Sequence, residues 1–169
     1  MAQAGILGED DRVELIQGEI IEMSPIGSTH AGCVTRLTMS LARELDERFA
    51  VGVQNPVRLD ASSEPQPDIS IYRTRAGSIV NETPTPDTVV LLIEVADSSY
   101  DYDHRVKLPL YARAGIAEYW IVDIPGGAIE RHTAPINTTY SHSTRATRGQ
   151  ALASTMLPEV ILDVDRVLG

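Results

Sequence analysis

The stretch Val89-Val90-Leu91-Leu92-Ile93-Glu94-Val95 decides the fold, because it is an apolar and largely β-branched run interrupted by a single acid. Runs of this kind are typical of strands that are buried on both faces of a sheet. A carboxylate in such a strand is costly unless it is paired, protonated or bound to a metal. The run therefore predicts a central strand, and it makes Glu94 a candidate functional residue. The alternative for Glu94 is a buried pair with an arginine.

A second candidate acid, Asp68, follows the proline-rich stretch Glu64-Pro65-Gln66-Pro67. It opens Asp68-Ile69-Ser70-Ile71-Tyr72, whose alternating apolar positions predict another strand. Two carboxylates at the ends of neighbouring strands can share a divalent cation. The alternative role for Asp68 is that of a loop-end carboxylate accepting hydrogen bonds from nearby amides.

Lys107 lies in the segment from His104 to Ala114, which is predicted to form a helix that ends at Gly115. Pro109 fits this helix only within the first turn or at a kink. A lysine near two carboxylates can hold or deprotonate a water beside a phosphate, which is the chemistry of phosphodiester hydrolysis. The alternative is an ordinary solvated helix lysine.

Glu19 and His30 are further candidates. Glu19 directly follows Gly18, the centre of a predicted hairpin; alternatively it is a strand-edge carboxylate facing water. His30 precedes Val34 by four residues, so it shares the apolar face of a predicted helix. It could contact a substrate phosphate or a metal-bound water, or it could be a core or capping histidine.

Other acids and histidines show no ligand spacing. Three aspartates lack the spacing and the glycine of a calcium loop, so we expect them to be caps and solvated loop carboxylates: Asp97, Asp101 and Asp103. Asp97 alone is close enough to Glu94 to be a supporting residue of the site. Three histidines show no spacing that indicates zinc: His104, His132 and His142.

The remaining pattern predicts a mixed architecture. A helix is expected from Ser28 or Thr29 to about Phe49. Strands are expected at 13–17, 19–23, 51–59, 118–123 and 128–132, and a strand followed by a helical turn is expected within 160–168. Residues 73–88 form the longest irregular stretch. The fold class is therefore α/β (α+β), with a sheet and flanking helices.

Length and composition indicate one soluble domain. The chain has 169 residues and 43% hydrophobic content, which is enough for one substantial core. It has no apolar run of membrane-spanning length and no targeting pattern, so we expect a cytoplasmic protein with no membrane partner. Cys33 is the only cysteine, so no internal disulfide forms, and we expect Cys33 to be structural.

The formal net charge of −10 opposes nonspecific binding to a polyanion, because such binding depends on contacts from lysine and arginine to phosphate. The segment 131–158 nevertheless holds three arginines and no acid. The arginines expected to contact nucleic acid are Arg73, Arg75, Arg131, Arg145 and Arg148. The alternative is that arginines on a polar strand discourage aggregation between sheet edges.

Seven motifs occur in order along the chain: Glu14–Ile20, Ser24–Gly27, His30, Gln54–Leu59, Glu64–Asp68, Leu92–Ser99 and Lys107–Ile116. In these motifs the chain resembles the Uma2 family, also called DUF820, from about residue 12 to the C-terminus. The resemblance implies a fold of the PD-(D/E)xK restriction-endonuclease type, with a mixed central sheet flanked by helices. It implies a single domain over residues 12–169, preceded by an N-terminal tail, residues 1–11.

The resemblance also implies an active site for Mg²⁺- or Mn²⁺-dependent cleavage of nucleic acid, with DNA favoured. Asp68 and Glu94 would hold the metal, with the Val95 carbonyl as a third ligand, and Lys107 would assist. The superfamily pattern Glu-x-Lys would place lysine at position 96, where this chain has Ala96. The lysine is therefore expected on the following helix.

Two other functions stay open, and so does the assembly. The chain could be a non-catalytic interaction or nucleic-acid-binding module that retains the fold. It could also hydrolyse another phosphate ester. A homodimer is expected by analogy with enzymes that cut two strands with paired active sites.

Overall fold

The computed structural model describes residues 12–74 and 83–169, so the predicted N-terminal tail and Arg75 lie outside the described residues. Its centre is a six-stranded sheet in the order β3-β4-β5-β6-β7-β8. Its strands are β3 (Phe49–Val53), β4 (Ile69–Arg73), β5 (Val89–Ala96), β6 (Glu118–Asp123), β7 (Ala128–Ile136) and β8 (Thr139–Thr147). The β5 and β6 strands are parallel and the other neighbours antiparallel, so the predicted mixed sheet is confirmed.

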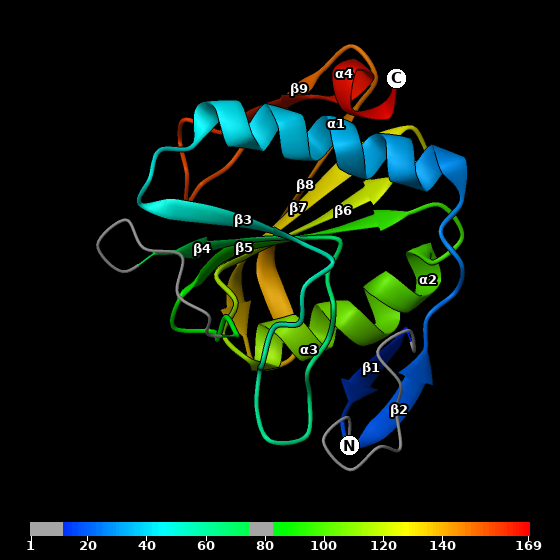
Figure 1. The fold of residues 1–169 in the computed structure, drawn as a ribbon. Coiled ribbons are helices and arrows are strands. Elements are labelled where there is room, and N and C mark those ends of the chain that lie inside the picture. The colour runs from blue at the N-terminus through cyan, green and yellow to red at the C-terminus, as the bar shows by residue number, and fades with distance from the viewer. Residues whose placement is uncertain (1–11, 75–82) are drawn as a thin grey trace.

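Helices cover both faces of this sheet (Figure 1). The long helix α1 (Ser28–Glu44) and the short α4 (Val164–Leu168) lie on one face. The other face carries α2 (Tyr100–Tyr102), the π-helical turn η2 (Asp103–Lys107) and α3 (Leu108–Arg113). Two small sheets complete the fold: β1 (Val13–Ile16) with β2 (Glu19–Glu22), and β9 (Ala151–Ala153) with β10 (Ile161–Asp163).

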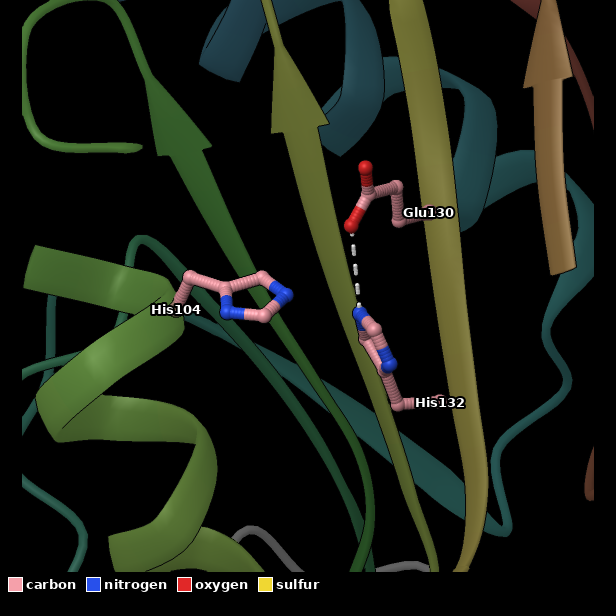
Figure 2. A group of neighbouring side chains, drawn as sticks. All are labelled: His104, Glu130 and His132. Carbon is pink, nitrogen blue, oxygen red and sulfur yellow. Dashed lines mark ion pairs between the residues drawn. The ribbon is translucent and has the colours of Figure 1, made fainter. Parts of the chain in front are cut away.

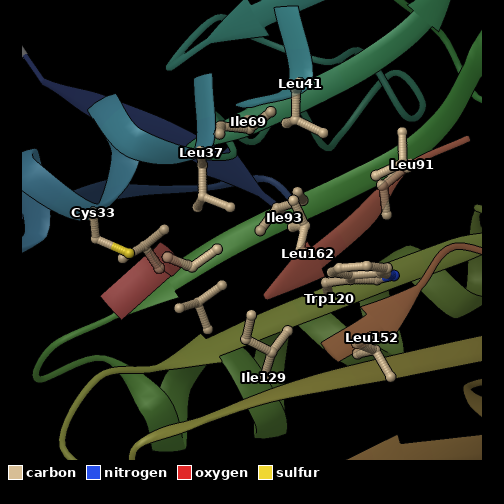
Figure 3. Packing of buried hydrophobic residues seen from close by; sticks show 14 of the residues in the cluster. Cys33, Leu37, Leu41, Ile69, Leu91, Ile93, Trp120, Ile129, Leu152 and Leu162 are labelled. Atoms are coloured by element: carbon tan, nitrogen blue, oxygen red, sulfur yellow. The ribbon is translucent and has the colours of Figure 1, made fainter. Parts of the chain in front are cut away.

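Two apolar cores result from the alternation of side chains along β5. Leu91, Ile93 and Val95 pack toward α1, where Leu37 and the single tryptophan, Trp120, are fully buried (Figure 3). Leu92 and Ala96 pack toward α3 on the opposite face. Because side chains alternate along a strand, Glu94 points to the α3 face. The pattern of the strand thus determines which helix this acid meets.

The helix on that face is continuous from Tyr100 to Arg113, but its middle turn is π-helical. Pro109 follows this wide turn and lies in the first turn of α3, where the N–H that proline lacks is not needed. This is one of the two placements expected for Pro109. The wide turn directs both Asp103 and Lys107 inward, since both side chains are buried.

Several predicted boundaries were wrong. The helix α1 ends at Glu44 rather than near Phe49, and Phe49 opens β3. The β3 strand stops at Val53 instead of reaching Leu59, because Gln54 adopts a left-handed conformation (φ 52°) that turns the chain out of the sheet. The predicted strand and helical turn within 160–168 are confirmed as β10 and α4.

The strand β8 was not predicted, and its sequence explains why. Only Tyr140 and Ala146 among its nine residues are buried, because β8 is the edge strand of the sheet and presents the rest of its side chains to solvent. None of the helices in residues 12–74 and 83–169 is both long and apolar enough to cross a membrane.

Candidate active site

A pocket of about 380 Å³ lies where the end of β5 meets the β1–β2 hairpin and the helix that begins at Tyr100. Its lining includes four carboxylates whose side chains are buried: Glu14, Asp68, Glu94 and Asp103. Lys107 lies among them. A pocket that combines buried acids with a buried base is a candidate site for catalysis or metal binding.

Glu94 reaches this pocket from near the C-terminal end of β5, on the face that Lys107 and Tyr111 cover. Its Oε1 accepts a hydrogen bond from the Tyr111 hydroxyl at 2.7 Å and one from Lys107 Nζ at 3.2 Å. Lys107 and Tyr111 are four residues apart, so they lie on the same face of the helix. Within the described residues, Glu94 Oε2 has only a long contact, at 3.4 Å, with the backbone N–H of Asp68. Lys107 and Tyr111 thus hold Glu94 through Oε1, which leaves Oε2 available to a ligand in the pocket.

Asp68 is fixed at the start of β4 by three hydrogen bonds. Its Oδ1 accepts one from the Gln54 side chain at 3.1 Å, and its Oδ2 accepts one from the backbone N–H of Val95 at 2.9 Å. The Nε2 of His30, in the first turn of α1, lies 3.0 Å from the same Oδ2. The N–H and the C=O of one strand residue point to the same side, so the Val95 carbonyl also faces the Asp68 end of β4.

Lys107 is the only lysine in the chain, and its side chain is only 4% exposed. Its Nζ lies 2.5 Å from Glu14 Oε1 as well as 3.2 Å from Glu94. The alternative of a solvated helix lysine is therefore wrong. The composition of the sequence already makes Lys107 unusual, because the chain has thirteen arginines and one lysine. A lysine ammonium differs from an arginine guanidinium in its chemistry, so the one lysine is a candidate for a specific role.

Asp103 belongs to this site, although a solvated loop carboxylate was expected. It is buried, and its Oδ2 accepts a hydrogen bond from Ser99 Oγ at 2.7 Å. Burial raises the pKa of Asp103 to about 6, against the opposing effects of Ser99 and Lys107. Asp97 and Asp101 are exposed, as expected. Asp103 is buried, unlike Asp97 and Asp101, because it lies in the π-helical turn.

The electrostatics of the site are those of crowded, buried acids. Burial raises the pKa of Glu94 to about 8, opposed by Lys107 and reinforced by Asp103 and Asp68. Burial also lowers the pKa of Lys107, but the charges of Glu94 and Glu14 outweigh burial and raise it above the ordinary lysine value. When its acids are ionised, the site holds more negative charge than Lys107 neutralises, so a bound cation would favour the ionised forms.

The two remaining candidates are placed differently. His30 joins the site through Asp68, and the hydrogen bond to Asp68 raises the pKa of His30 although burial opposes it. Glu19 is exposed on β2 and does not line the pocket described here. The hairpin instead contributes Glu14 from β1, which is 4% exposed and also accepts a hydrogen bond from the Gln66 N–H at 2.6 Å. Sequence patterns did not single out Glu14.

Two polar atoms of the pocket have no hydrogen-bond partner within the part of the chain that the structure describes. They are the Tyr102 hydroxyl and Nδ1 of His30, and both residues line the pocket. Buried polar groups are normally paired, so unpaired groups in a pocket indicate a place for an exogenous partner.

The arginines expected to contact nucleic acid are largely engaged within the chain. Arg145 pairs with Glu130 and Asp123, and Arg148 pairs with Asp165. Arg131 donates hydrogen bonds to the Ala153 carbonyl and to Thr144. Arg73 is exposed at the end of β4. Their contact with nucleic acid stays a prediction.

Comparison with known proteins agrees with this architecture. A solved structure described as "a putative nuclease belonging to DUF820" from Anabaena variabilis ATCC 29413 superposes with a TM-score of 0.71 at 15% identity. The alignment covers 98% of this chain and 94% of that one, which establishes a common fold. A search of curated proteins found no match. The model of the Uma2 family, described as "Putative restriction endonuclease", matches residues 2–165, and the chain therefore belongs to the Uma2 family.

Proposed function

We propose that the protein is an Mg²⁺- or Mn²⁺-dependent nuclease that hydrolyses phosphodiester bonds, with DNA as the favoured substrate. The observation that carries the proposal is the arrangement of four buried carboxylates around the only lysine of the chain, in a pocket of about 380 Å³. Burial of this many acids beside a single lysine is costly unless some of the acids are protonated or a cation binds.

The donor atoms suit a hard divalent cation. Asp68 and Glu94 supply carboxylate oxygens, and Glu94 Oε2 is free of any short hydrogen bond within the described residues. The Val95 carbonyl lies on the same side of β5 as the Val95 N–H, which donates a hydrogen bond to Asp68. Oxygen ligands of this kind are those that Mg²⁺ and Mn²⁺ prefer. We assign Asp68, Glu94 and the Val95 carbonyl as ligands.

A bound divalent cation supplies Lewis-acid polarisation of a phosphodiester oxygen and acidifies a water. The chain itself contributes the ammonium group of Lys107. Two of its three N–H groups donate to Glu14 and Glu94. The third has no acceptor among the described residues, so it can orient the attacking water or stabilise charge that develops on the phosphate. Glu14 positions the ammonium, and His30 positions Asp68.

Family membership supports this assignment, because the Uma2 family is described as "Putative restriction endonuclease" and the Anabaena structure as "a putative nuclease". The lysine comes from the helix after β5 rather than from position 96, yet its Nζ lies 3.2 Å from Glu94. An ammonium in this position can act whichever segment of backbone supplies it.

A non-catalytic nucleic-acid-binding or interaction module is the second candidate. The net charge of −10 and the engagement of Arg145 and Arg148 with acids favour it, because both weaken attraction to a polyanion. A module of this kind would not need a metal in the carboxylate pocket. The two candidates therefore differ in their response to divalent cations.

The test has two arms. Calorimetric titration of Mn²⁺ into the wild type, Glu94→Gln and Asp68→Asn measures metal binding, and labelled DNA and RNA duplexes and single strands with Mg²⁺ or Mn²⁺ measure cleavage. Glu19→Gln is the matched control, since it removes an exposed carboxylate outside the pocket. All variants are first shown to be folded by circular dichroism.

The proposal expects Mn²⁺ binding and metal-dependent cleavage in the wild type and in Glu19→Gln, and neither in Glu94→Gln or Asp68→Asn. Metal binding without cleavage of any nucleic acid would favour another phosphate ester as substrate. No metal binding to the wild type at millimolar Mn²⁺ would favour the non-catalytic module. The expected homodimer is tested in the same samples by analytical ultracentrifugation.

A further inference from the structure

Three potential metal ligands gather on the α3 face of the sheet, outside the lining of the carboxylate pocket. Glu130 and His132 are two residues apart on β7, so their side chains lie on the same face of that strand. His104 extends toward them from η2 (Figure 2). The ligand atoms of the three side chains all lie within 4.8 Å of one another.

His132 is the most informative member of this group. It is only 4% exposed, yet its Nε2 has no hydrogen-bond partner within the described residues. That nitrogen lies 3.4 Å from Oε2 of Glu130, in an ion-pair contact that lacks the direction of a hydrogen bond. Two ligands bound to one tetrahedral zinc at about 2.1 Å are separated by about 3.4 Å. The spacing of the two atoms is therefore that of a pair of zinc ligands.

Glu130 is held so that this second oxygen faces the histidine. Its Oε1 accepts a hydrogen bond from the Tyr100 hydroxyl at 2.9 Å and another from Arg145. Asp123 also pairs with Arg145, which balances the charge of the guanidinium. Metal-binding carboxylates are typically oriented by hydrogen bonds of this kind to the oxygen that does not bind the metal.

His132 is oriented by packing. The Tyr119 ring stacks against it, with centroids 6.1 Å apart and an angle of 28° between the planes. His104 is exposed, and its ring lies edge-on to that of His132, with centroids 6.0 Å apart and an angle of 81°. Two ligands are thus fixed on a strand, while the third, His104, is an exposed side chain of η2.

We propose that His104, Glu130 and His132 bind a zinc ion or a similar transition-metal ion at a site distinct from the carboxylate pocket. Two imidazoles and one carboxylate are a common ligand set for Zn²⁺, whereas Mg²⁺ prefers oxygen ligands alone. The ion would join η2, which carries Lys107, to β7 of the sheet. The proposal rests on these three side chains and is independent of the proposed nuclease function.

The test is a calorimetric titration of Zn²⁺ into the tag-free, metal-free full chain and four variants. His104→Ala and His132→Ala each remove one ligand, and the exposed position of His104 makes its variant the less disturbing of the two. His142→Ala is the matched control, because it removes an exposed histidine of β8 outside the group. Asp68→Asn separates zinc bound in the carboxylate pocket from zinc bound here.

We expect this group to bind one Zn²⁺ equivalent, which remains in Asp68→Asn. Its affinity should fall at least about tenfold in His104→Ala and His132→Ala and should be unchanged in His142→Ala. Saturating Zn²⁺ should raise the Tm of the wild type and of His142→Ala more than that of His104→Ala. Equal affinity of the wild type and His104→Ala for Zn²⁺ would overturn the site. Loss of Zn²⁺ binding in Asp68→Asn but in none of the histidine variants would overturn it too. Absence of Zn²⁺ binding to the wild type would overturn it as well.

Discussion

Lys107 Nζ and Glu14 Oε1 lie 2.5 Å apart although 93 residues separate them in the sequence. Glu14 comes from β1 of the N-terminal hairpin, and Lys107 comes from the π-helical turn after β5. The hairpin therefore closes one side of the pocket and supplies an acid that the sheet itself does not provide. This contact, rather than Glu19 on the next strand, connects the hairpin to the chemistry of the site.

The first prediction compares these two acids of the hairpin. Glu14→Gln removes the charge that holds the Lys107 ammonium, and displacement of such a group costs on the order of 10²-fold in rate. Glu19→Gln removes an exposed carboxylate and should leave the rate unchanged. The measurement is the initial rate of Mn²⁺-dependent cleavage by each variant. Loss of activity in Glu19→Gln with full activity in Glu14→Gln would show that the hairpin acts through β2 instead.

The second prediction concerns the ionisation of Lys107. Burial lowers its pKa, but Glu94 and Glu14 outweigh burial and raise the pKa above the ordinary value of 10.5. The stabilising contribution of the charged lysine is therefore fully present below pH 10.5 and is lost as the pH rises through the higher folded value. Protein labelled with ¹³C-lysine provides the measurement, because one lysine gives one ¹³Cε resonance.

In the folded protein that resonance should show no titration midpoint at or below pH 10.5, whereas in urea it should titrate near 10.5. Glu14→Gln is expected to lower the folded pKa, since it removes one of the two charges that raise it. A folded midpoint below 10.5 in the wild type would show that burial outweighs the two acids.

A third prediction concerns stability away from the pocket. The buried Glu118 accepts hydrogen bonds from the Trp120 indole at 2.5 Å and from Ser154, Thr155 and Met156, which ties the loop after β9 to the sheet. Glu118→Leu would remove the acceptor of two buried donors, the Trp120 indole and the Ser154 hydroxyl, and should cost about 3 kcal/mol in the free energy of unfolding. Urea denaturation followed by the fluorescence of Trp120 measures the change.

The matched control is Glu159→Leu, which removes a carboxylate from an exposed position of the same loop after β9. It should change the free energy of unfolding by less than about 0.5 kcal/mol. Equal effects of the two substitutions would show that the contacts of Glu118 contribute nothing beyond those of a surface acid.

Prediction from the sequence succeeded where the signal is local. The apolar run around Glu94 and the alternation after Asp68 gave the correct central strands, and the structure brings both acids together with Lys107 and His30. Each of these residues belongs to a short pattern with a physical cause: strand burial, helix spacing, or a proline before a strand. Such patterns need no knowledge of which distant segments meet.

Residues whose role depends on tertiary contacts could not be found in this way. Glu14 belongs to a short strand whose alternating pattern is that of any half-buried strand. Asp103 differs from the nearby aspartates only because it lies in the wide helical turn. In the chain, the helix α3 and the strand β6 lie between His104 and His132, so the spacing of the two histidines in the sequence carries no zinc signal. Only the pairing of β6 with β7 brings His132 beneath the helix.

A last prediction follows from the packing of Cys33, which was expected to be structural. Its side chain is buried against Leu37 and the neighbouring apolar residues beneath α1 (Figure 3). Burial raises the pKa of the thiol from its ordinary value of 9.0 to about 11, and the opposing charge of Arg36 does not cancel this effect. Because the thiolate is the reactive form, Cys33 should resist alkylation in the folded protein at pH 8.

Mass spectrometry after treatment with iodoacetamide measures this resistance. One alkyl group should be added within minutes in urea and only very slowly in native buffer, at a rate set by transient opening of the helix. Cys33→Ser should accelerate unfolding, because a buried hydroxyl without a partner costs about 1–3 kcal/mol, whereas Cys33→Ala should cost less. Rapid alkylation of the native protein would show instead that α1 separates readily from the sheet, and His30, which holds Asp68 from the first turn of α1, would then be mobile as well.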